Sequence, residues 1–302
     1  MCGIFGAVGN YDVSKLKILA LFNETRGRDS SGFFNGTHLL KVAKPVRELL
    51  TNEFLKTKHP FMMGHTRFAT TGAVTDDNSH PFQHGRIIGT HNGVVSNFDE
   101  LKLKYDLKDM QVDSEIIFWG LDKFGVEFLK EVEAYWGLAW FNQSDTSGLY
   151  LSVHSHELAV AHAPKAFYYA SDIKDLERIG LKPVSLKDDH LYRVDVKTLQ
   201  MKREKLRGLK SRFAYSYHSY KSCYPDPYER FPENIHVDPL DPLAVRLTDA
   251  ELDELMDLEY EYERAGTLQG EKLTRYFELS EKDMKESISR QADDAVDEVI
   301  IQ

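Results

Sequence analysis

The stretch that decides the fold is Cys2-Gly3-Ile4-Phe5-Gly6-Ala7-Val8-Gly9, which follows Met1 directly. Its apolar run, interrupted by glycines, predicts a short buried strand. Leucines and a phenylalanine at positions 16, 19, 21 and 22 follow at roughly helical spacing and predict a helix after that strand. The glycines, and the absence of a basic segment in front of the run, argue against a secretory signal peptide.

Cys2 carries the first chemical hypothesis. A thiolate is the reactive form of cysteine, and an unperturbed cysteine is mostly thiol at neutral pH, so the side chain needs a base close by. If Met1 is removed, Cys2 acquires a free α-amine with a reference pKa of ~7.7–8.0. One residue would then supply both nucleophile and base. Taken alone, Cys2 is better interpreted as an incidental second residue.

Alternating apolar and polar runs continue to about residue 204. Asn35-Gly36 lies between two apolar runs and predicts a hairpin. Four β-rich runs between residues 134 and 171 predict a meander, and two more between 190 and 204 predict a final pair of strands. Asp113 is a plausible N-cap for a helix that continues to residue 124, and residues 173–179 predict a short helix.

The character of the chain changes after residue 205. We therefore expect one domain over residues 1–205 and an extension over residues 206–302. The first part of the extension is rich in Tyr, Pro and Ser and predicts an extended segment. Thr248 and Glu251 form a capping box before an acidic amphipathic helix, and Ser280 is a candidate cap for a last helix.

Composition excludes several functional classes. The net charge of -10 makes a nucleic-acid partner unexpected. Two cysteines, Cys2 and Cys223, cannot form a disulfide framework and fit a reducing compartment, so we expect a cytoplasmic protein. No apolar run approaches ~20 residues, so no membrane span or membrane association is predicted.

Several polar segments follow apolar elements, where loops usually hold functional sites. They are Arg26-Gly27-Arg28-Asp29-Ser30, Gly64-His65-Thr66-Arg67-Phe68-Ala69-Thr70, His80-Pro81-Phe82, His91-Asn92-Gly93 and Asp113-Ser114-Glu115. With Cys2-Gly3-Ile4-Phe5-Gly6, these segments resemble, in order and in spacing, the class II glutamine amidotransferases. Those are the glutaminase domains of the N-terminal nucleophile hydrolases, as in glucosamine-6-phosphate synthase and asparagine synthetase B. The resemblance covers about residues 2–200.

The resemblance implies a fold and an activity. The expected fold class is α+β, a four-layer αββα sandwich of two antiparallel sheets flanked by helices, followed by the extended and helical extension. The expected activity is that of an amidohydrolase, which converts the side-chain amide of L-glutamine to glutamate and ammonia through a thioester on Cys2. No metal ion and no organic cofactor is expected.

The resemblance also assigns roles to single residues. Arg67 would bind the substrate carboxylate through its planar guanidinium, and Asp113 would accept hydrogen bonds from the substrate ammonium. Asn92 and Gly93 would donate to the oxyanion. Further implied roles are orientation of the N-terminal residue by Arg26, substrate contacts from Phe68 and His80, and a mobile loop containing Thr70 and Gly72.

Two positions depart from the family pattern, and several residues have a purely structural interpretation. Many members have Trp where this chain has Phe68, and the synthase-type loop has His where this chain has Thr71, which leaves the acceptor subfamily open. Alone, Arg67 would be a surface charge at a strand end and Asp113 a helix cap. The histidines at 59, 65, 80, 84 and 91 lack metal-ligand spacing, and we interpret them as core or loop residues.

Family members normally join this domain to one that consumes the ammonia, and residues 205–302 lack the signatures of such a domain. We therefore expect a separate ammonia-accepting synthase as partner. Two other hypotheses remain. One is a stand-alone hydrolase of γ-glutamyl amides of larger amines, and the other is a catalytically silent binding module.

Overall fold

The computed structural model describes residues 2–56 and 59–210, and beyond these only positions 254, 258, 275 and 279. The chain divides into two compact units, Met1–Tyr217 and His218–Gln302. In the second unit the four described positions are helical, and Arg275 forms an ion pair with Glu254 at 3.0 Å. The predicted extended segment, capping box and last helix lie outside the described residues, so the role of residues 206–302 stays a prediction.

The strands of the first unit form two antiparallel sheets. The first sheet has the order β11-β9-β10-β1-β4-β2-β3 and the second has the order β13-β12-β8-β7-β6-β5. The first sheet consists of β1 (Gly3–Gly9), β2 (Ser30–Phe34), β3 (Leu39–Val42), β4 (Phe61–Arg67), β9 (Ala159–Ala163), β10 (Ala166–Ala170) and β11 (Val184–Ser185). The second consists of β5 (Phe82–His84), β6 (Ile87–Val95), β7 (Ala134–Asn142), β8 (Asp145–His154), β12 (His190–Asp195) and β13 (Met201–Lys205).

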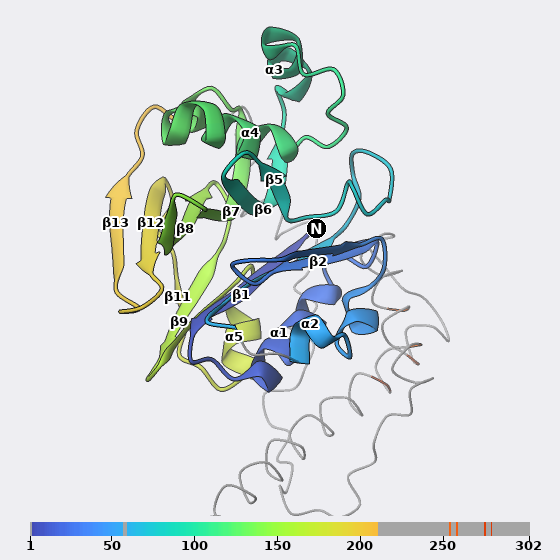
Figure 1. The fold of residues 1–302 in the computed structure, drawn as a ribbon, viewed down its shortest axis with the longest axis vertical. Coiled ribbons are helices and arrows are strands. Elements are labelled where there is room, and N and C mark those ends of the chain that lie inside the picture. Colours follow the sequence, from blue (N-terminus) through green and yellow to red (C-terminus); the bar gives the residue numbers. More distant parts are fainter. Residues whose placement is uncertain are drawn as a thin grey trace, which may run out of the picture. The chain divides into compact units, whose positions relative to one another are not determined.

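Helices cover the outer faces of both sheets. They are α1 (Val13–Glu24), α2 (Glu53–Lys56), α3 (Phe98–Tyr105), α4 (Glu115–Phe124) and α5 (Ile173–Arg178), with 3₁₀ turns η1 (Val46–Leu49) and η2 (Gly125–Lys130). In Figure 1, α1, α2 and α5 lie on the first sheet, and α4 lies on the second. The predicted four-layer αββα sandwich is therefore confirmed. None of the helices in the described part of the chain has the length and apolarity that a membrane crossing requires.

The alternation of side chains along β1 explains why this strand is a nearly continuous apolar run. Ile4 and Val8 pack into the core between the two sheets, whereas Phe5 and Ala7 pack into the core beneath α1. Successive side chains of a strand point to opposite faces, so a strand buried on both faces needs apolar residues at nearly every position.

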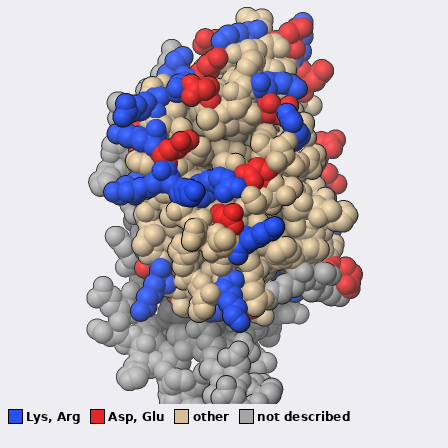
Figure 2. All heavy atoms as spheres, turned by 60° about the vertical axis from the view of Figure 1, so that its left-hand side comes forward, with Lys and Arg blue, Asp and Glu red and all other residues tan. Residues whose placement is uncertain are grey.

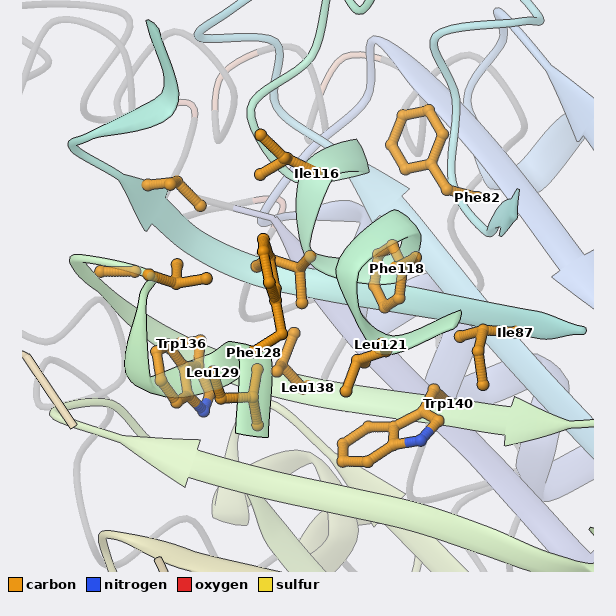
Figure 3. Packing of buried hydrophobic residues seen from close by; sticks show 14 of the residues in the cluster. Phe82, Ile87, Ile116, Phe118, Leu121, Phe128, Leu129, Trp136, Leu138 and Trp140 are labelled. Atoms are coloured by element: carbon orange, nitrogen blue, oxygen red, sulfur yellow. The ribbon is translucent and has the colours of Figure 1, made fainter. Parts of the chain in front are cut away.

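The second sheet packs on α4 and η2 through large side chains. Figure 3 shows Trp136, Leu138 and Trp140 of β7 beneath Phe118 of α4 and Phe128 of η2. Trp136 and Leu138 are fully buried, and truncation of such a residue typically costs ~2–5 kcal/mol of folding free energy. This layer fixes β6 and the start of α4, both of which carry predicted site residues.

Two local predictions are wrong. The four runs between residues 134 and 171 do not form a meander, because β7 and β8 pair in the second sheet while β9 and β10 pair in the first. The chain crosses between the sheets after β8, where Ser155 has a φ of 50°. Asp113 is not the cap of α4, since Ser114 is the N-cap and the Asp113 carboxylate accepts a hydrogen bond from Val95 N–H at 2.9 Å.

The outer strand β13 is charged. Lys202, Arg203 and Lys205 are exposed on it, and Figure 2, which brings this side forward, shows Lys and Arg side chains among acidic ones. Charged side chains on an edge strand oppose pairing with a further strand, which is a sufficient account of this surface.

Candidate active site

The candidate site begins at Cys2, the residue immediately before β1. Gly3 pairs with Thr66 of β4, so Cys2 lies beside the end of β4. The Cys2 sulfur accepts a hydrogen bond from Phe68 N–H at 3.4 Å and lies 3.6 Å from Phe68 O. The thiol is free and half-buried. The sheet register therefore positions the sulfur against the backbone that leads out of β4.

Several groups act on the pKa of the Cys2 thiol. Burial raises this pKa, the Phe68 N–H and the Arg67 cation lower it, and the Asp113 carboxylate raises it. Burial dominates, so the sulfur is held mainly as a thiol and needs a base to become a nucleophile. Arg67 and Asp113 both lie within electrostatic range of the sulfur, although they are 46 residues apart in sequence.

Arg26 holds the backbone of Cys2. Its Nε donates to Cys2 O at 3.1 Å, and its Nη1 lies 3.8 Å from the Asp172 carboxylate. The next residue, Gly27, must be glycine, because a Cβ atom there would lie 2.4 Å from the carbonyl carbon of Arg67. Asp29 N–H then donates to Arg67 O at 3.0 Å. Residues 26–29 thus support both the nucleophile and the end of β4.

Arg67 is buried, with 2% of its surface exposed. Its guanidinium donates to the carbonyl oxygens of Thr71 and, at 3.1 Å, of Ala73. Burial lowers the pKa of Arg67, while the nearby groups of Cys2, Asp29 and Asp113 raise it. Among the described residues, these partners are neutral carbonyls, so the charge of Arg67 can still bind a carboxylate, which forms stronger charge-assisted hydrogen bonds than a neutral carbonyl.

Asn92 and Gly93 come from the middle of β6. Asn92 is buried, and its Nδ2 donates to Ser171 Oγ at 3.3 Å. Gly93 has a φ of 153°, and a Cβ atom there would lie 2.0 Å from Tyr135 O. Only glycine fits this close approach of two strands. The second sheet thus carries the buried Asn92 amide next to a glycine whose backbone lies close to Tyr135.

The other predicted residues differ in placement. Thr70 is exposed on the loop after β4, and Gly72 on the same loop has a φ of 80°. Phe68 contacts Cys2 through its backbone. His80 is buried, with its ring stacked on His65 at 4.0 Å and against Phe82 at 4.5 Å, so it faces the protein interior.

The buried histidines are held neutral. Burial lowers the pKa of His65 to about 3, and it also lowers the pKa values of His80 and His91. His91 Nδ1 bonds Ser114 Oγ at 2.8 Å, which ties β6 to the start of α4. These rings therefore serve the packing of the layers that carry Asn92 and Asp113.

A separate group of possible ligand atoms occurs at His154, Asp188 and Asp189, all within 4.8 Å of one another. His154 Nδ1 and Asp189 Oδ1 already bond each other at 2.6 Å, and Asp188 accepts from Ser155 N–H at 2.6 Å. Asp188 is exposed. These bonds account for the group as a loop-stabilising pair.

Sequence reasoning assigned no role to three contributors. Asp29 accepts from Ala69 N–H at 2.7 Å, Ser171 contacts Asn92, and Asp172 contacts Arg26. Asp29 and the turn Ala170-Ser171-Asp172 lie in segments that resemble the family, but their partners lie too far away in sequence to be inferred from spacing.

Comparisons with known proteins find relatives of this chain in sequence and in fold. No protein-family model matches the chain. A glutamine–fructose-6-phosphate aminotransferase of Gluconobacter oxydans is 31% identical over 210 residues, which cover 62% of this chain and 34% of that protein. The corresponding protein of Lactococcus lactis is 37% identical over 147 residues, 45% of this chain and 24% of that protein. The chain thus matches about a third or less of the length of these relatives.

A solved structure, the glutamine phosphoribosylpyrophosphate amidotransferase of B. subtilis complexed with ADP and GMP, superposes with a TM-score of 0.56. The two are 18% identical, and the superposition covers 68% of this chain and 49% of that one, which shows a common fold. Over about two thirds of its length the chain is similar to glutamine-dependent aminotransferases in sequence and to a glutamine amidotransferase in fold. In this part of the chain the Cys2 sulfur lies within electrostatic range of Arg67 at the end of β4 and of Asp113 just before α4.

Proposed function

We propose that this chain hydrolyses the side-chain amide of L-glutamine to glutamate and ammonia, and that a separate enzyme consumes the ammonia. The observation that carries this proposal is the position of the Cys2 sulfur. It lies against Phe68 N–H and within electrostatic range of one buried cation, Arg67, and one buried carboxylate, Asp113. A free amino acid presents the complementary pair of charges.

Substrate recognition rests on this pair of charges. The Arg67 guanidinium exchanges the carbonyls of Thr71 and Ala73 for the α-carboxylate of glutamine. The Asp113 carboxylate retains its bond from Val95 N–H and accepts from the α-ammonium with its remaining capacity. The side-chain amide then extends toward Cys2.

The first chemical step forms a thioester. After Met1 is removed, the α-amine of Cys2 takes the thiol proton, and the thiolate attacks the Cδ carbonyl carbon. Asn92 Nδ2 and Gly93 N–H donate to the oxyanion. The amine returns the proton to the leaving nitrogen, the C–N bond breaks, and ammonia departs.

The second step hydrolyses the thioester. The same α-amine accepts a proton from water, and the resulting hydroxide adds to the acyl carbon while the same donors hold the oxyanion. The C–S bond breaks, the thiolate is protonated, and glutamate leaves. No step requires a metal ion or an organic cofactor. Arg26, bonded to Cys2 O at 3.1 Å, keeps the amine and sulfur in register with the carbonyl.

The proposal of a separate enzyme that accepts the ammonia rests on the behaviour of ammonia in water. Ammonia released into water is protonated and diluted, so a synthase that receives it directly would gain efficiency. The segment matched in this chain makes up 34% of the length of the Gluconobacter oxydans aminotransferase, which leaves most of that protein without a counterpart in the matched segment.

The test is glutamine hydrolysis by the purified chain. We expect wild type and Cys223→Ala to release glutamate at equal rates, and Cys2→Ala to lose the activity, since Cys223 is the only other cysteine. A panel of γ-glutamyl amides then follows. Cleavage of bulky amides in preference to glutamine would replace the proposal with a γ-glutamyl hydrolase, and an inert wild type with Met1 retained would indicate a silent module.

A further inference from the structure

The turn between β10 and α5 connects the two halves of the site. Ser171, 3% exposed, follows β10 directly. Its Oγ accepts from Ile4 N–H at 2.8 Å, and its own N–H donates to Ile4 O at 2.8 Å. The same Oγ accepts from Asn92 Nδ2 at 3.3 Å. One hydroxyl thus bridges the nucleophile strand of the first sheet and the oxyanion donor of the second.

The neighbouring residue reinforces this link. Asp172 lies 3.8 Å from Arg26, and Arg26 donates to Cys2 O at 3.1 Å. Asp172 also caps α5 by accepting from Lys174 N–H at 2.9 Å, so it is itself fixed. The two consecutive side chains therefore each contact a residue of the proposed site, Ser171 through Asn92 and Asp172 through Arg26.

We propose that Ser171 is a positioning residue for glutamine hydrolysis, which holds the Asn92 amide in register with Cys2 so that one N–H remains directed at the oxyanion. This inference rests on the proposed function. The torsion that rotates an Asn amide is broad, so an amide without a partner samples orientations that waste the donor. Ser171 restricts the amide, and its bond to Ile4 ties that orientation to the strand that begins next to Cys2.

The test is Ser171→Ala, with Ser152→Ala as the matched control. Ser152 is equally buried, and its Oγ accepts from Trp136 Nε1 at 3.1 Å within the second sheet. We expect Ser171→Ala to lower kcat for glutamine about tenfold with KM unchanged, as for one orienting hydrogen bond. Ser152→Ala should leave kcat unchanged, and Ser171→Thr should restore most of it.

Alkylation of Cys2 by iodoacetamide tests the sulfur independently of the oxyanion donors, because displacement of iodide by the thiolate develops no oxyanion. The rate at which Cys2 is alkylated should match between wild type and Ser171→Ala. A double-mutant cycle adds a second test. In an Asn92→Ala background, Ser171→Ala should lower kcat less than twofold, because the donor that it positions is already gone.

The outcomes distinguish the two proposals. An inert wild type sinks the proposed function, and the role of Ser171 falls with it. An active wild type with equal kcat in Ser171→Ala and Ser152→Ala overturns the positioning role alone. Slower alkylation of Cys2 in Ser171→Ala, or a full tenfold loss in the Asn92→Ala background, also overturns it.

Discussion

The two sheets contribute different kinds of group to the site, and they hold them in different ways. The first sheet supplies the proposed nucleophile, Cys2, immediately before β1, and the cation Arg67 at the end of the paired strand β4. The second supplies Asn92 and Gly93 on β6, and Asp113 just before α4. Register alone brings Cys2 and Arg67 together, whereas the second set depends on side-chain bonds and on one glycine.

This difference predicts which side-chain substitutions should disturb the site most. Backbone ladders of the first sheet tolerate the loss of a side chain, because their hydrogen bonds do not involve it. Alignment across the sheets depends on the core that contains Ile4 and on a few bonds such as Asn92 to Ser171. Apart from loss of Cys2 itself, which should abolish the activity, substitutions in the second sheet should therefore affect kcat more than substitutions of comparable size in the first.

The largest effect is expected for Asn92→Ala. Loss of one oxyanion donor should lower kcat by about 10²–10³-fold with little change in KM. Asn97 is the control, since its buried amide bonds Glu131 O and Glu133 N–H, each at 2.9 Å, and serves only the fold. Asn97→Ala should lower stability and leave kcat near wild type. Steady-state kinetics on both variants checks this, and equal values of kcat for Asn92→Ala and Asn97→Ala would contradict the role of Asn92 as an oxyanion donor.

A smaller effect is expected for the two charges that read the substrate. Arg67→Lys and Asp113→Asn should each raise KM about 10–100-fold, as for one charge-assisted hydrogen bond, with kcat largely kept. Substrate analogues sharpen the assignment. Glutaramate, which lacks the α-ammonium, should be hydrolysed equally by wild type and Asp113→Asn. Glutamine α-amide, which lacks the α-carboxylate, should be hydrolysed equally by wild type and Arg67→Lys. The opposite pairing would exchange the two roles.

Much of the fold follows from sequence because β1, β4 and β6 are apolar runs that end in polar residues. The assignment of strands to sheets does not follow, since β8 and β9 look alike in sequence and the crossing at Ser155 is set by tertiary contacts. In the site, Cys2 and Arg67 could be predicted as a pair only through the resemblance to the class II glutamine amidotransferases, because each residue alone has a simpler interpretation. The role of Ser171 could not, because its partner Ile4 is 167 residues away.

The smallest effect is expected on stability, from the outer layer of the first sheet. Burial, followed by the charge of Asp172, raises the pKa of Asp175 to about 7, while Arg178 and Arg26 lower it. Asp175 Oδ1 and Asn23 Oδ1 both lack a hydrogen-bond partner among the described residues, although Asn23 Nδ2 donates to Asp175 Oδ2 at 3.2 Å. A neutral amide at position 175 would replace the unpartnered carboxylate oxygen with a donor and keep an oxygen that accepts from Asn23 Nδ2.

The sign of the pH dependence follows from the raised pKa of Asp175. Below pH 3.8, the ordinary pKa, this carboxyl holds its proton in both the folded and the unfolded chain, so it does not lower the free energy of unfolding. Between there and about 7 the unfolded chain releases the proton first, and the free energy of unfolding falls as pH rises. Asp175→Asn should therefore gain about 1–3 kcal/mol at pH 8 and little at pH 4. Urea denaturation at both values checks this, and an equal gain at both would contradict it.

The central claim is that the sulfur of Cys2 and the two charge readers form one site for a free amino acid. The most direct measurement is mass spectrometry after treatment with an electrophilic glutamine analogue such as 6-diazo-5-oxo-L-norleucine. The account predicts a single adduct on Cys2 of chains that lack Met1, prevented by L-glutamine and not by D-glutamine. Modification of Cys223 instead, or labelling of Cys2 that L-glutamine does not slow, would contradict it.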